Sequence, residues 1–432
     1  MSEDTRIVPE WQRERRPPRV VIVGGGFGGL YAARALASAN VELTVLDRTN
    51  HHLFQPLLYQ VATATLAPTD ITAPIRWLLR RQRNTEVLMT EVQRIEPTKR
   101  VVVASDGREF PYDYLILAAG ARHAYFNHPE WEKTAPGLKS IDDAIVLRQR
   151  ILTAFERAEL TENAVERDAW LTFVIVGAGP TGTELAGMLP TIAKHTVPRD
   201  FKRIANAPTR VVLLEGGPKV LPTYPDELSE HARHDLINLG VEVRTGALVT
   251  RVERGCVHVG TEEIRTNTII WAAGNAASPL GKTLGAPVDR VGRVLVQPDL
   301  SIPEHPEIFV IGDQASISTK GKPVPGVAPA AMQMGRHAAK NIRRDLEQRA
   351  RLPFVYRNKG DLATIGRHRA IADFGFVQLS GFVAWFFWLF VHILYLAGFR
   401  NRLSVLIEWG YSYFTYERGA RLITARTARP SE

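Results

Sequence analysis

The first clear pattern in the chain is a short apolar run that is followed by glycines and then by a helix-forming segment. Residues 20–23 read VVIV, the turn at 24–29 reads GGGFGG, and residues 30–36 read LYAARAL. A second apolar run at 41–46 ends at Asp47. This order predicts a buried strand, a tight turn, a helix and a parallel second strand. The G-x-G-x-x-G spacing of a dinucleotide-binding turn falls on Gly24, Gly26 and Gly29.

The same pattern recurs in the middle of the chain. Residues 173–176 read FVIV, the turn at 177–182 reads GAGPTG, residues 183–189 read TELAGML, and an apolar run at 211–214 ends at Glu215. A terminal acid accepts hydrogen bonds from ribose hydroxyls and repels a 2′-phosphate, which favours NADH over NADPH. Two turns with two terminal acids therefore predict two bound dinucleotides. The three glycine roles of the second turn fall on Gly177, Gly179 and Gly182.

Three other strand ends complete this pattern. Residues 307–313 read EIFVIGD, residues 115–120 read LILAAG and residues 269–274 read IIWAAG. The first resembles the Gly-Asp motif that contacts FAD in flavin reductases, and the other two resemble the A-x-G elements that close each nucleotide site. The resemblance implies that the first fold binds FAD and that the second, inserted fold binds NADH.

The predicted fold class is α/β, with two Rossmann-like dinucleotide-binding domains and a C-terminal helical membrane-attachment region. We expect a disordered tail at 1–19, the FAD domain at 20–125 and 285–345, the NADH domain at 126–284 and the attachment region at 346–432. The predicted cofactor-binding residues are Gly24, Gly26, Gly29, Asp47, Arg48, Ala119, Gly120, Gly312, Asp313 and Ala331 for FAD, and Gly177, Gly179, Gly182, Glu215 and Gly274 for NADH.

Composition limits the chemistry that this fold can carry out. The chain has 432 residues, a formal net charge of +9 and one cysteine, Cys256. A single cysteine leaves no disulfide framework, no CxxC redox pair and no ligand set for an iron-sulfur cluster or a cysteine-based zinc site, so redox chemistry must come from a bound organic cofactor. Cys256 itself is expected to be a small structural residue. No metal is expected, and His51 and His52 are expected to pack beside the flavin.

Several segments outside the two turns resemble type II NADH dehydrogenases, the non-proton-pumping NADH:quinone oxidoreductases. Residues 50–60 read NHHLFQPLLYQ, residues 327–333 read VAPAAMQ, residues 356–366 read YRNKGDLATIG and residues 398–403 read GFRNRL. The resemblance extends over essentially the whole chain after the tail. It implies an FAD enzyme that passes electrons from NADH to a membrane quinone.

The resemblance also implies three catalytic residues. Glu184 lies where the family places a carboxylate near the nicotinamide and the flavin, although a favourable acid in a first helical turn is an alternative. Gln333 is the second glutamine of the quinone motif A-Q-x-A-x-Q; Pro329 replaces the first and cannot donate a hydrogen bond. Lys359 would neutralise charge near the reduced flavin or quinone, or is a solvated surface lysine.

The C-terminal region carries a membrane signal. No charged residue occurs at 374–399, so hydropathy alone predicts a transmembrane helix. The resemblance favours helices that lie in the membrane interface, and Gly375, Gly381 and Gly398 weaken a continuous span. A third interpretation is a soluble protein that buries this region in a homodimer. The downstream residues that suit anionic headgroups are Arg400, Arg402, Arg418, Arg421, Arg426 and Arg429, with Trp409, Tyr411, Tyr413, Phe414 and Tyr416.

These patterns together predict an FAD-dependent NADH:quinone oxidoreductase that is attached peripherally to the cytoplasmic face of the cell membrane. Its expected partners are a membrane quinone and an anionic lipid surface. Two alternatives are a soluble NADH:ferredoxin-type reductase, which has no need of the apolar C-terminus, and a non-catalytic redox-sensing flavoprotein. No nucleic-acid-binding module is recognisable, so nucleic acid is not an expected partner.

Overall fold

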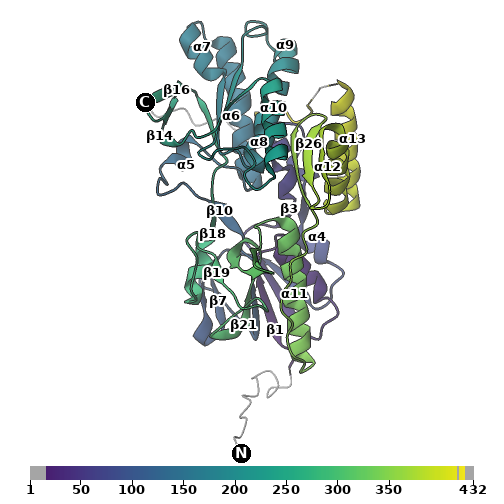
Figure 1. The fold of residues 1–432 in the computed structure, drawn as a ribbon. Helices are drawn as coiled ribbons and strands as arrows, with labels where there is room; N and C mark the ends of the chain where they lie inside the picture. The colour runs from purple at the N-terminus through teal and green to yellow at the C-terminus, as the bar shows by residue number, and fades with distance from the viewer. Residues whose placement is uncertain (1–15, 416–417, 424–432) are drawn as a thin grey trace, which may run out of the picture. The chain divides into compact units, whose positions relative to one another are not determined.

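The computed structural model describes residues 16–415 and 418–423, and its backbone clusters into two compact units (Figure 1). Unit 1 consists of Met1–His52, Ala73–Arg122 and Asn275–Asn358, and unit 2 of Leu53–Thr72, His123–Gly274 and Lys359–Glu432. Most of the predicted tail lies outside the described residues, as do Tyr416, Arg426 and Arg429.

Unit 1 is built on a six-stranded sheet. Its order is β20 (Ser301–Ile302), β21 (His305–Val310), β9 (Tyr114–Leu117), β1 (Arg19–Val23), β2 (Glu42–Asp47) and β5 (Thr85–Met89). All pairings are parallel except β20 with β21. The apolar residues of β1 and β9 are buried, as expected for a parallel sheet that is covered on both faces.

Two helices of unit 1 cross closely. Helix α2 (Phe27–Ala35) follows the first glycine turn, and α11 (Ala328–Leu346) packs against it beside the sheet (Figure 1). A Cβ atom built on Gly335 of α11 would lie 2.2 Å from the Gly28 carbonyl oxygen of α2. The crossing therefore needs glycine at position 335. An antiparallel sheet of β6 (Val92–Glu96), β7 (Val101–Ala104) and β8 (Glu109–Pro111) completes this unit.

Unit 2 contains the second nucleotide fold. Its parallel sheet has the order β13 (Val241–Arg244), β12 (Arg210–Leu214), β11 (Thr172–Val176) and β17 (Thr268–Trp271). Helix α8 (Pro180–His195) follows the second glycine turn. The other long helices are α6 (Ile141–Leu160) and α10 (Asp226–Asn238), and an antiparallel sheet consists of β14 (Val249–Glu253), β15 (Cys256–Val259) and β16 (Glu262–Arg265).

The C-terminal part of unit 2 is a small antiparallel sheet followed by two helices. The sheet comprises β25 (Asp361–Gly366), β26 (Arg369–Asp373) and β27 (Gln378–Ser380), and the helices are α12 (Gly381–Tyr395) and α13 (Phe399–Thr415). Helix α12 packs on β25 and β26.

The remaining elements are short. The helical ones are α3 (Leu58–Ala62), α4 (Ile75–Leu79), α5 (Trp131–Thr134), α7 (Ala164–Trp170), α9 (Val197–Asp200), η1 (Gln55–Leu57), η2 (Pro68–Asp70), η3 (Pro97–Lys99), η4 (Pro279–Leu284) and η5 (Gly312–Gln314). The strands are β3 (His51–Leu53), β4 (Thr72–Pro74), β10 (Ala121–His123), β18 (Asn275–Ala277), β19 (Val294–Leu295), β22 (Ala315–Ser316), β23 (Ser318–Thr319) and β24 (Lys322–Pro323).

The predicted fold class is confirmed, and both predicted strand-turn-helix units are present. The apolar run at 374–399 is not one helix, because Gly375, Gly381 and Gly398 adopt positive φ values of 80°, 69° and 91°. These values break the run into a turn, β27, α12 and a second turn. Among the described residues, no helix is both long and apolar enough to cross a membrane.

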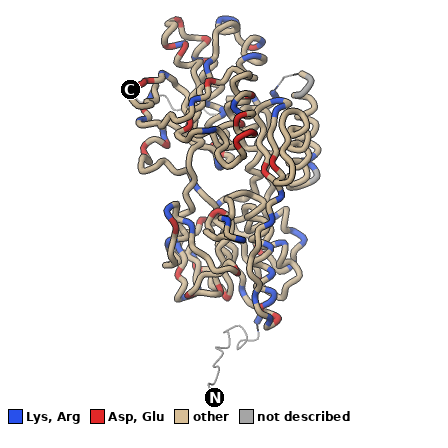
Figure 2. The backbone as a smooth tube through the Cα atoms, viewed as in Figure 1, with Lys and Arg blue, Asp and Glu red and all other residues tan. Residues whose placement is uncertain are grey.

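Basic and acidic residues are interspersed along both units (Figure 2). The net charge of +9 is therefore not confined to one segment of the chain. Helix α12 carries neither kind of residue.

We predict that Gly335→Ala lowers the free energy of unfolding by about 1–3 kcal/mol, because the new methyl group collides with backbone at the α2–α11 crossing. The matched control is Gly410→Ala in α13, whose added Cβ would meet nothing within 4 Å. It should be neutral or stabilise by up to about 1 kcal/mol. Thermal unfolding of the purified full chain measures both changes, and equal effects of the two substitutions would contradict the close crossing.

Candidate functional site

The two glycine turns have the same local geometry. The Gly24 N–H donates to the Leu46 carbonyl (2.8 Å), and the Gly177 N–H donates to the Leu214 carbonyl (2.7 Å). Each bond ties a turn to the end of the neighbouring parallel strand. The second unit thus repeats the construction of the first, as the sequence pattern predicts.

Glycine is sterically required at two positions of each turn. Gly24 and Gly177 have φ values of +105° and +100°, and a Cβ on either would lie within 2.8 Å of the adjacent strand-end backbone. A Cβ on Gly29 would lie 1.8 Å from the Gly24 oxygen, and one on Gly182 would lie 1.8 Å from the Gly177 oxygen. The third glycine therefore lets each helix start directly on its turn.

The middle glycine of each turn has open space where a side chain would lie. A Cβ on Gly26 or Gly179 would meet no atom within 4 Å. Each of these residues immediately precedes the first turn of its helix, where backbone N–H groups have no intrahelical acceptor. Such a site accepts the pyrophosphate of a dinucleotide, so both turns fit the groups expected there.

A carboxylate ends the second strand of each fold. The Gly25 N–H donates to Asp47 Oδ2 (2.6 Å), and the Ala178 N–H donates to Glu215 Oε2 (2.7 Å). Both carboxylates are half-buried, and Asp47 Oδ2 and Glu215 Oε2 each have a second lone pair with which to accept from a ribose hydroxyl. Arg48, the residue after Asp47, is exposed.

The other predicted FAD residues gather within unit 1. Gly312 has a φ of +66°, and a Cβ there would lie 3.3 Å from the Ala331 Cβ. The half-buried Asp313 follows directly. Ala119 and Gly120 end the A-x-G segment, where Gly120 has a φ of +67°.

Sequence reasoning missed Gln314, which is fully buried and donates through Nε2 to the carbonyls of Gly120 (2.7 Å) and Ser278 (3.2 Å). It therefore fixes the A-x-G end against the Gly-Asp motif. In unit 2, Gly274 ends the corresponding segment with a φ of +73° and is exposed.

His52 is buried beside the first turn. One of its ring nitrogens, Nδ1, lies 3.1 Å from the Gly25 carbonyl oxygen, and its ring meets Phe27 edge-on at 5.1 Å. Burial lowers the pKa of His52 to about 4, so the ring is neutral at physiological pH. His51 lies next to Asn50, with Nδ1 3.1 Å from its Oδ1.

Glu184 lies on α8 and faces the start of the C-terminal sheet. Burial raises the pKa of its carboxyl group well above the usual value, and a hydrogen bond from the Thr364 backbone opposes this shift only in part. The side chain retains a small solvent-accessible surface, yet protein groups replace most of its hydrating water. Burial therefore favours the protonated, neutral form of the Glu184 carboxyl group.

A buried polar chain near Glu184 was not predicted. The Trp409 indole of α13 donates to Gln60 Oε1 (2.6 Å), and Gln60 Nε2 lies 2.8 Å from the Tyr59 hydroxyl. Burial and then the negative charge of Glu184 raise the pKa of Tyr59 well above its usual value. The sequence placed Tyr59 and Gln60 in a family-like segment, but nothing in it indicated the contact with residue 409.

Gln333 does not present a free amide. Its Nε2 donates to the Arg357 carbonyl and its Oε1 accepts from the Arg357 N–H, both at 3.0 Å. Pro329 occupies the first turn of α11, where a missing N–H costs nothing. Lys359 belongs to unit 2, and its Nζ lies 3.2 Å from the Tyr395 hydroxyl.

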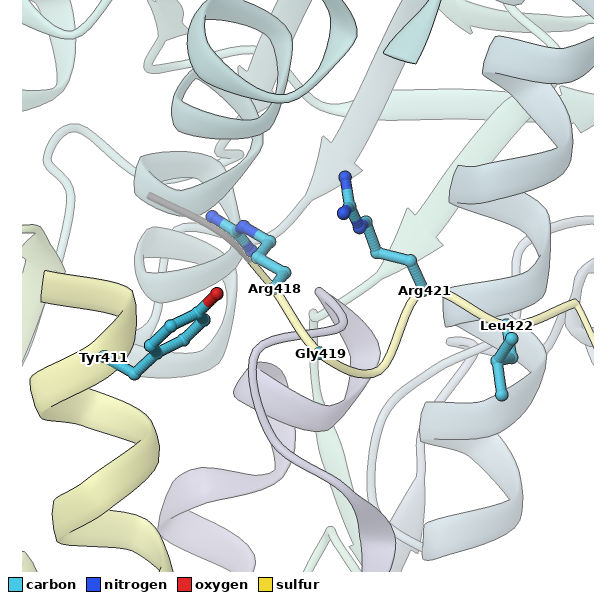
Figure 3. Close-up of a pocket in the computed structure, with 5 residues that line it drawn as sticks. All are labelled: Tyr411, Arg418, Gly419, Arg421 and Leu422. Atoms are coloured by element: carbon cyan, nitrogen blue, oxygen red, sulfur yellow. The ribbon is translucent and has the colours of Figure 1, made fainter. Parts of the chain in front are cut away.

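Three of the predicted headgroup-binding arginines make contacts inside unit 2. Arg402 donates to the carbonyls of Leu394 (2.8 Å) and Leu396 (2.9 Å). Arg418 is 6% exposed, donates to the Thr63 carbonyl (2.5 Å) and Thr65 Oγ1 (3.0 Å), and has its pKa lowered to about 9 by burial. Arg421 pairs with Asp200. Arg418 and Arg421 line a shallow cavity of about 390 Å³ together with Tyr411, Gly419 and Leu422 (Figure 3).

Comparison with known proteins agrees with this geometry. Residues 18–335 match the family described as pyridine nucleotide-disulphide oxidoreductase, and residues 358–415 match the NDH2 C-terminal domain. The chain is 43% identical to the type II NADH:quinone oxidoreductase Ndh of Mycobacterium tuberculosis, over 97% of this chain and 94% of that protein. It is 44% identical to NdhA of the same organism, over 94% and 90%.

A solved structure has the same fold. NDH2 from Plasmodium falciparum in complex with NADH superposes with a TM-score of 0.86, at 22% identity, covering 95% of this chain and all of that one. The two turns and the family match define a pyridine nucleotide-disulphide oxidoreductase. Within that class, the chain belongs to the type II NADH:quinone oxidoreductases.

The raised pKa of Glu184 predicts a pH-dependent effect of Glu184→Gln on stability. Between the usual carboxyl pKa of 4.5 and the higher folded-state pKa, the folded protein binds more protons than the unfolded chain, so stability falls as pH rises. The substitution removes the titrating group and with it this loss of stability. Above about pH 4.5, the free energy of unfolding of the variant should therefore rise relative to that of the parent protein, by at most about 1.4 kcal/mol per pH unit.

Denaturant unfolding of the full chain at several pH values measures this gain. The control is Glu156→Gln at an exposed position of α6. A Glu184→Gln effect that is independent of pH, or equal to that of the control, would show that the carboxyl group is ionised in the folded protein.

Proposed function

We propose that this protein transfers a hydride from NADH to bound FAD and then two electrons to a membrane quinone, without pumping protons. The observation that carries the proposal is the repeated turn, with Asp47 and Glu215 each accepting from the N–H of the residue after the first glycine. Membership of the type II NADH:quinone oxidoreductases supports the same reaction.

We assign one dinucleotide to each unit. In unit 1, the turn at 24–29, Asp47 and the Gly312–Asp313 pair would hold FAD, and in unit 2 the turn at 177–182 and Glu215 would hold NADH. When bound, FAD accepts a hydride and releases electrons in a second step. The protein contributes mainly positioning, because reacting groups held in contact avoid the entropy cost of meeting.

We assign Glu184 to positioning or proton delivery beside the nicotinamide. A buried carboxyl group with a raised pKa keeps its proton to a higher pH than an exposed glutamate does, and a protonated carboxyl group can donate a proton or a hydrogen bond. The buried Tyr59 hydroxyl and the Gln60 amide give this acid polar surroundings.

We propose that Gln333 fixes the backbone at Arg357 near the end of unit 1, because both ends of its amide are used there. Lys359 we retain as a candidate for charge neutralisation.

The exposed apolar face of α12 and α13 supports membrane attachment. Phe382, Phe386 and Phe390, four residues apart, are 56%, 57% and 58% exposed, whereas Ala384 and Trp388 are buried against the protein. Helix α13 adds the exposed residues Leu403, Leu406, Ile407 and Tyr411. An exposed apolar surface of this kind is typical of an interfacial helix pair. We propose peripheral attachment to the cytoplasmic face, the side on which NADH is produced, on an anionic lipid surface.

We predict that the purified, FAD-loaded chain oxidises NADH rapidly with a soluble quinone and slowly or not at all with a ferredoxin. Glu184→Gln should keep its FAD but turn over more slowly, because the replaced group can no longer deliver a proton. Steady-state NADH oxidation and flavin absorbance measure both. Reoxidation by ferredoxin alone would contradict the quinone assignment, and unchanged kinetics of Glu184→Gln would remove its assigned role.

We also predict that replacing Phe382, Phe386 and Phe390 together by serine abolishes binding to vesicles that contain anionic lipid. The matched control replaces Leu160, Val165 and Leu248, which are exposed to similar or greater degrees elsewhere in unit 2, and should bind as the parent does. Vesicle flotation measures binding, and NADH-dependent flavin reduction checks folding. Retained flotation, with a loss of dimer in solution, would instead identify this face as a contact between two copies.

A further inference from the structure

The hairpin of β14 and β15 carries chemistry that the proposed reaction does not use. Its strands are joined by a turn at Arg254 and Gly255, where Gly255 has a φ of +90°. Val252 pairs with Val257 and both are buried in the core of unit 2. The alternation of a strand then directs Glu253, which pairs with Cys256, and His258 to the opposite, outer face.

Three potential metal-ligand atoms converge on this outer face. Cys256 Sγ lies 3.4 Å from His258 Nε2 and 3.9 Å from Glu253 Oε2, and His258 Nε2 lies 3.4 Å from Glu253 Oε2. Metal–ligand bonds of about 2.3 Å to sulfur and about 2.0–2.2 Å to nitrogen and oxygen give tetrahedron edges of about 3.4–3.6 Å. The three atoms therefore already lie close to one face of a zinc-like tetrahedron.

The same geometry argues against a nucleophilic triad. In such a triad the nucleophile and the orienting carboxylate contact different nitrogens of the histidine ring. Here the Cys256 thiol and the Glu253 carboxylate approach the same nitrogen, Nε2. Convergence on one point in space is what a shared cation requires, and it is not what a proton relay requires.

We propose that Glu253, Cys256 and His258 bind a thiophilic divalent cation of the zinc class on the outer face of this hairpin. Thiolate, imidazole and carboxylate form an accepted ligand set, and their two negative charges match the ion. A water completes the coordination. All three side chains are half-buried, so the ion reaches the site from solvent without opening of the fold.

Charged side chains surround the three potential ligand atoms. Arg251 pairs with the carboxylate of Glu253, while Glu263, the cross-strand partner of His258, lies 3.3 Å from Arg265. Burial, together with the charges of Glu263 and Glu253, raises the pKa of the Cys256 thiol. Cysteine binds a metal ion as the thiolate, so metal binding releases the thiol proton.

Sequence spacing alone did not predict this site, and a structural role was expected for Cys256. The pattern E-x-x-C-x-H becomes a cluster only because a two-residue hairpin turn sets Glu253 opposite Cys256. None of the three residues is among those assigned to either dinucleotide, so we expect loss of the site to leave NADH:quinone turnover unchanged.

The test uses the chelator-treated, FAD-loaded full chain and Zn²⁺ as the probe. Because Cys256 is the only thiol, its rate of alkylation reports the site without ambiguity. We expect Zn²⁺ to bind at one ion per chain in calorimetry, to block alkylation and to release it on chelation. Co²⁺ should give a thiolate-to-metal charge-transfer band in the difference spectrum against the flavin.

Matched variants separate a built site from adventitious binding. Cys256→Ser should abolish the Co²⁺ band, and Glu253→Gln and His258→Ala should each weaken Zn²⁺ binding by roughly tenfold or more. His234→Ala, at an exposed histidine 3.2 Å from Glu230 on α10, should have no effect. Any of three outcomes would overturn the proposal. Zn²⁺ leaves the alkylation rate unchanged, Co²⁺ gives no charge-transfer band, or the His258→Ala and His234→Ala variants bind Zn²⁺ with equal affinity.

Discussion

The hydrogen bond from each glycine turn to the carboxylate at the end of the neighbouring strand organises both nucleotide folds. Gly25 donates to Asp47 and Ala178 donates to Glu215 across nearly equal distances of 2.6 and 2.7 Å. The turn can take this position only because Gly24 and Gly177 have no side chain; a Cβ on Gly24 would collide with the Ala118 backbone, and one on Gly177 with the backbone at Ala272 and Ala273. The same bond holds the carboxylate where a ribose would lie and leaves the helix N-terminus open to phosphate.

A second feature of the structure is the burial of Glu184, to which we assign a role in the proposed reaction. A carboxyl group that is kept neutral by burial is costly to stability above its ordinary pKa, so its retention needs a compensating use. Tyr59, Gln60 and Trp409 surround this region with hydrogen-bonded polar groups rather than with water. The C-terminal region therefore contributes to two parts of the structure: its phenylalanines form an exposed apolar face, and its Trp409 hydrogen-bonds to the buried Gln60.

The sequence was sufficient to predict the two nucleotide folds, because the strand, turn and helix of each fold are encoded within about thirty residues of continuous chain. It could not predict contacts that join distant segments, such as Trp409 with Gln60 or Gln314 with Gly120. Hydropathy alone predicts a transmembrane helix at 374–399, whereas the three glycines favoured an interrupted run, and their positive φ values do divide it. The roles given to Glu184, Gln333 and Lys359 came from resemblance, and they remain predictions; the amide of Gln333 bonds to backbone at Arg357.

The most direct test of the central assignment, one dinucleotide secured by each strand-end carboxylate, compares Asp47→Asn with Glu215→Gln. Flavin content per chain and the ratio of kcat/KM for NADH to that for NADPH are measured for both purified variants. The assignment predicts that Asp47→Asn loses FAD, whereas Glu215→Gln keeps FAD and narrows the preference for NADH. Loss of FAD from Glu215→Gln to the same extent, or an unchanged nucleotide preference, would contradict it.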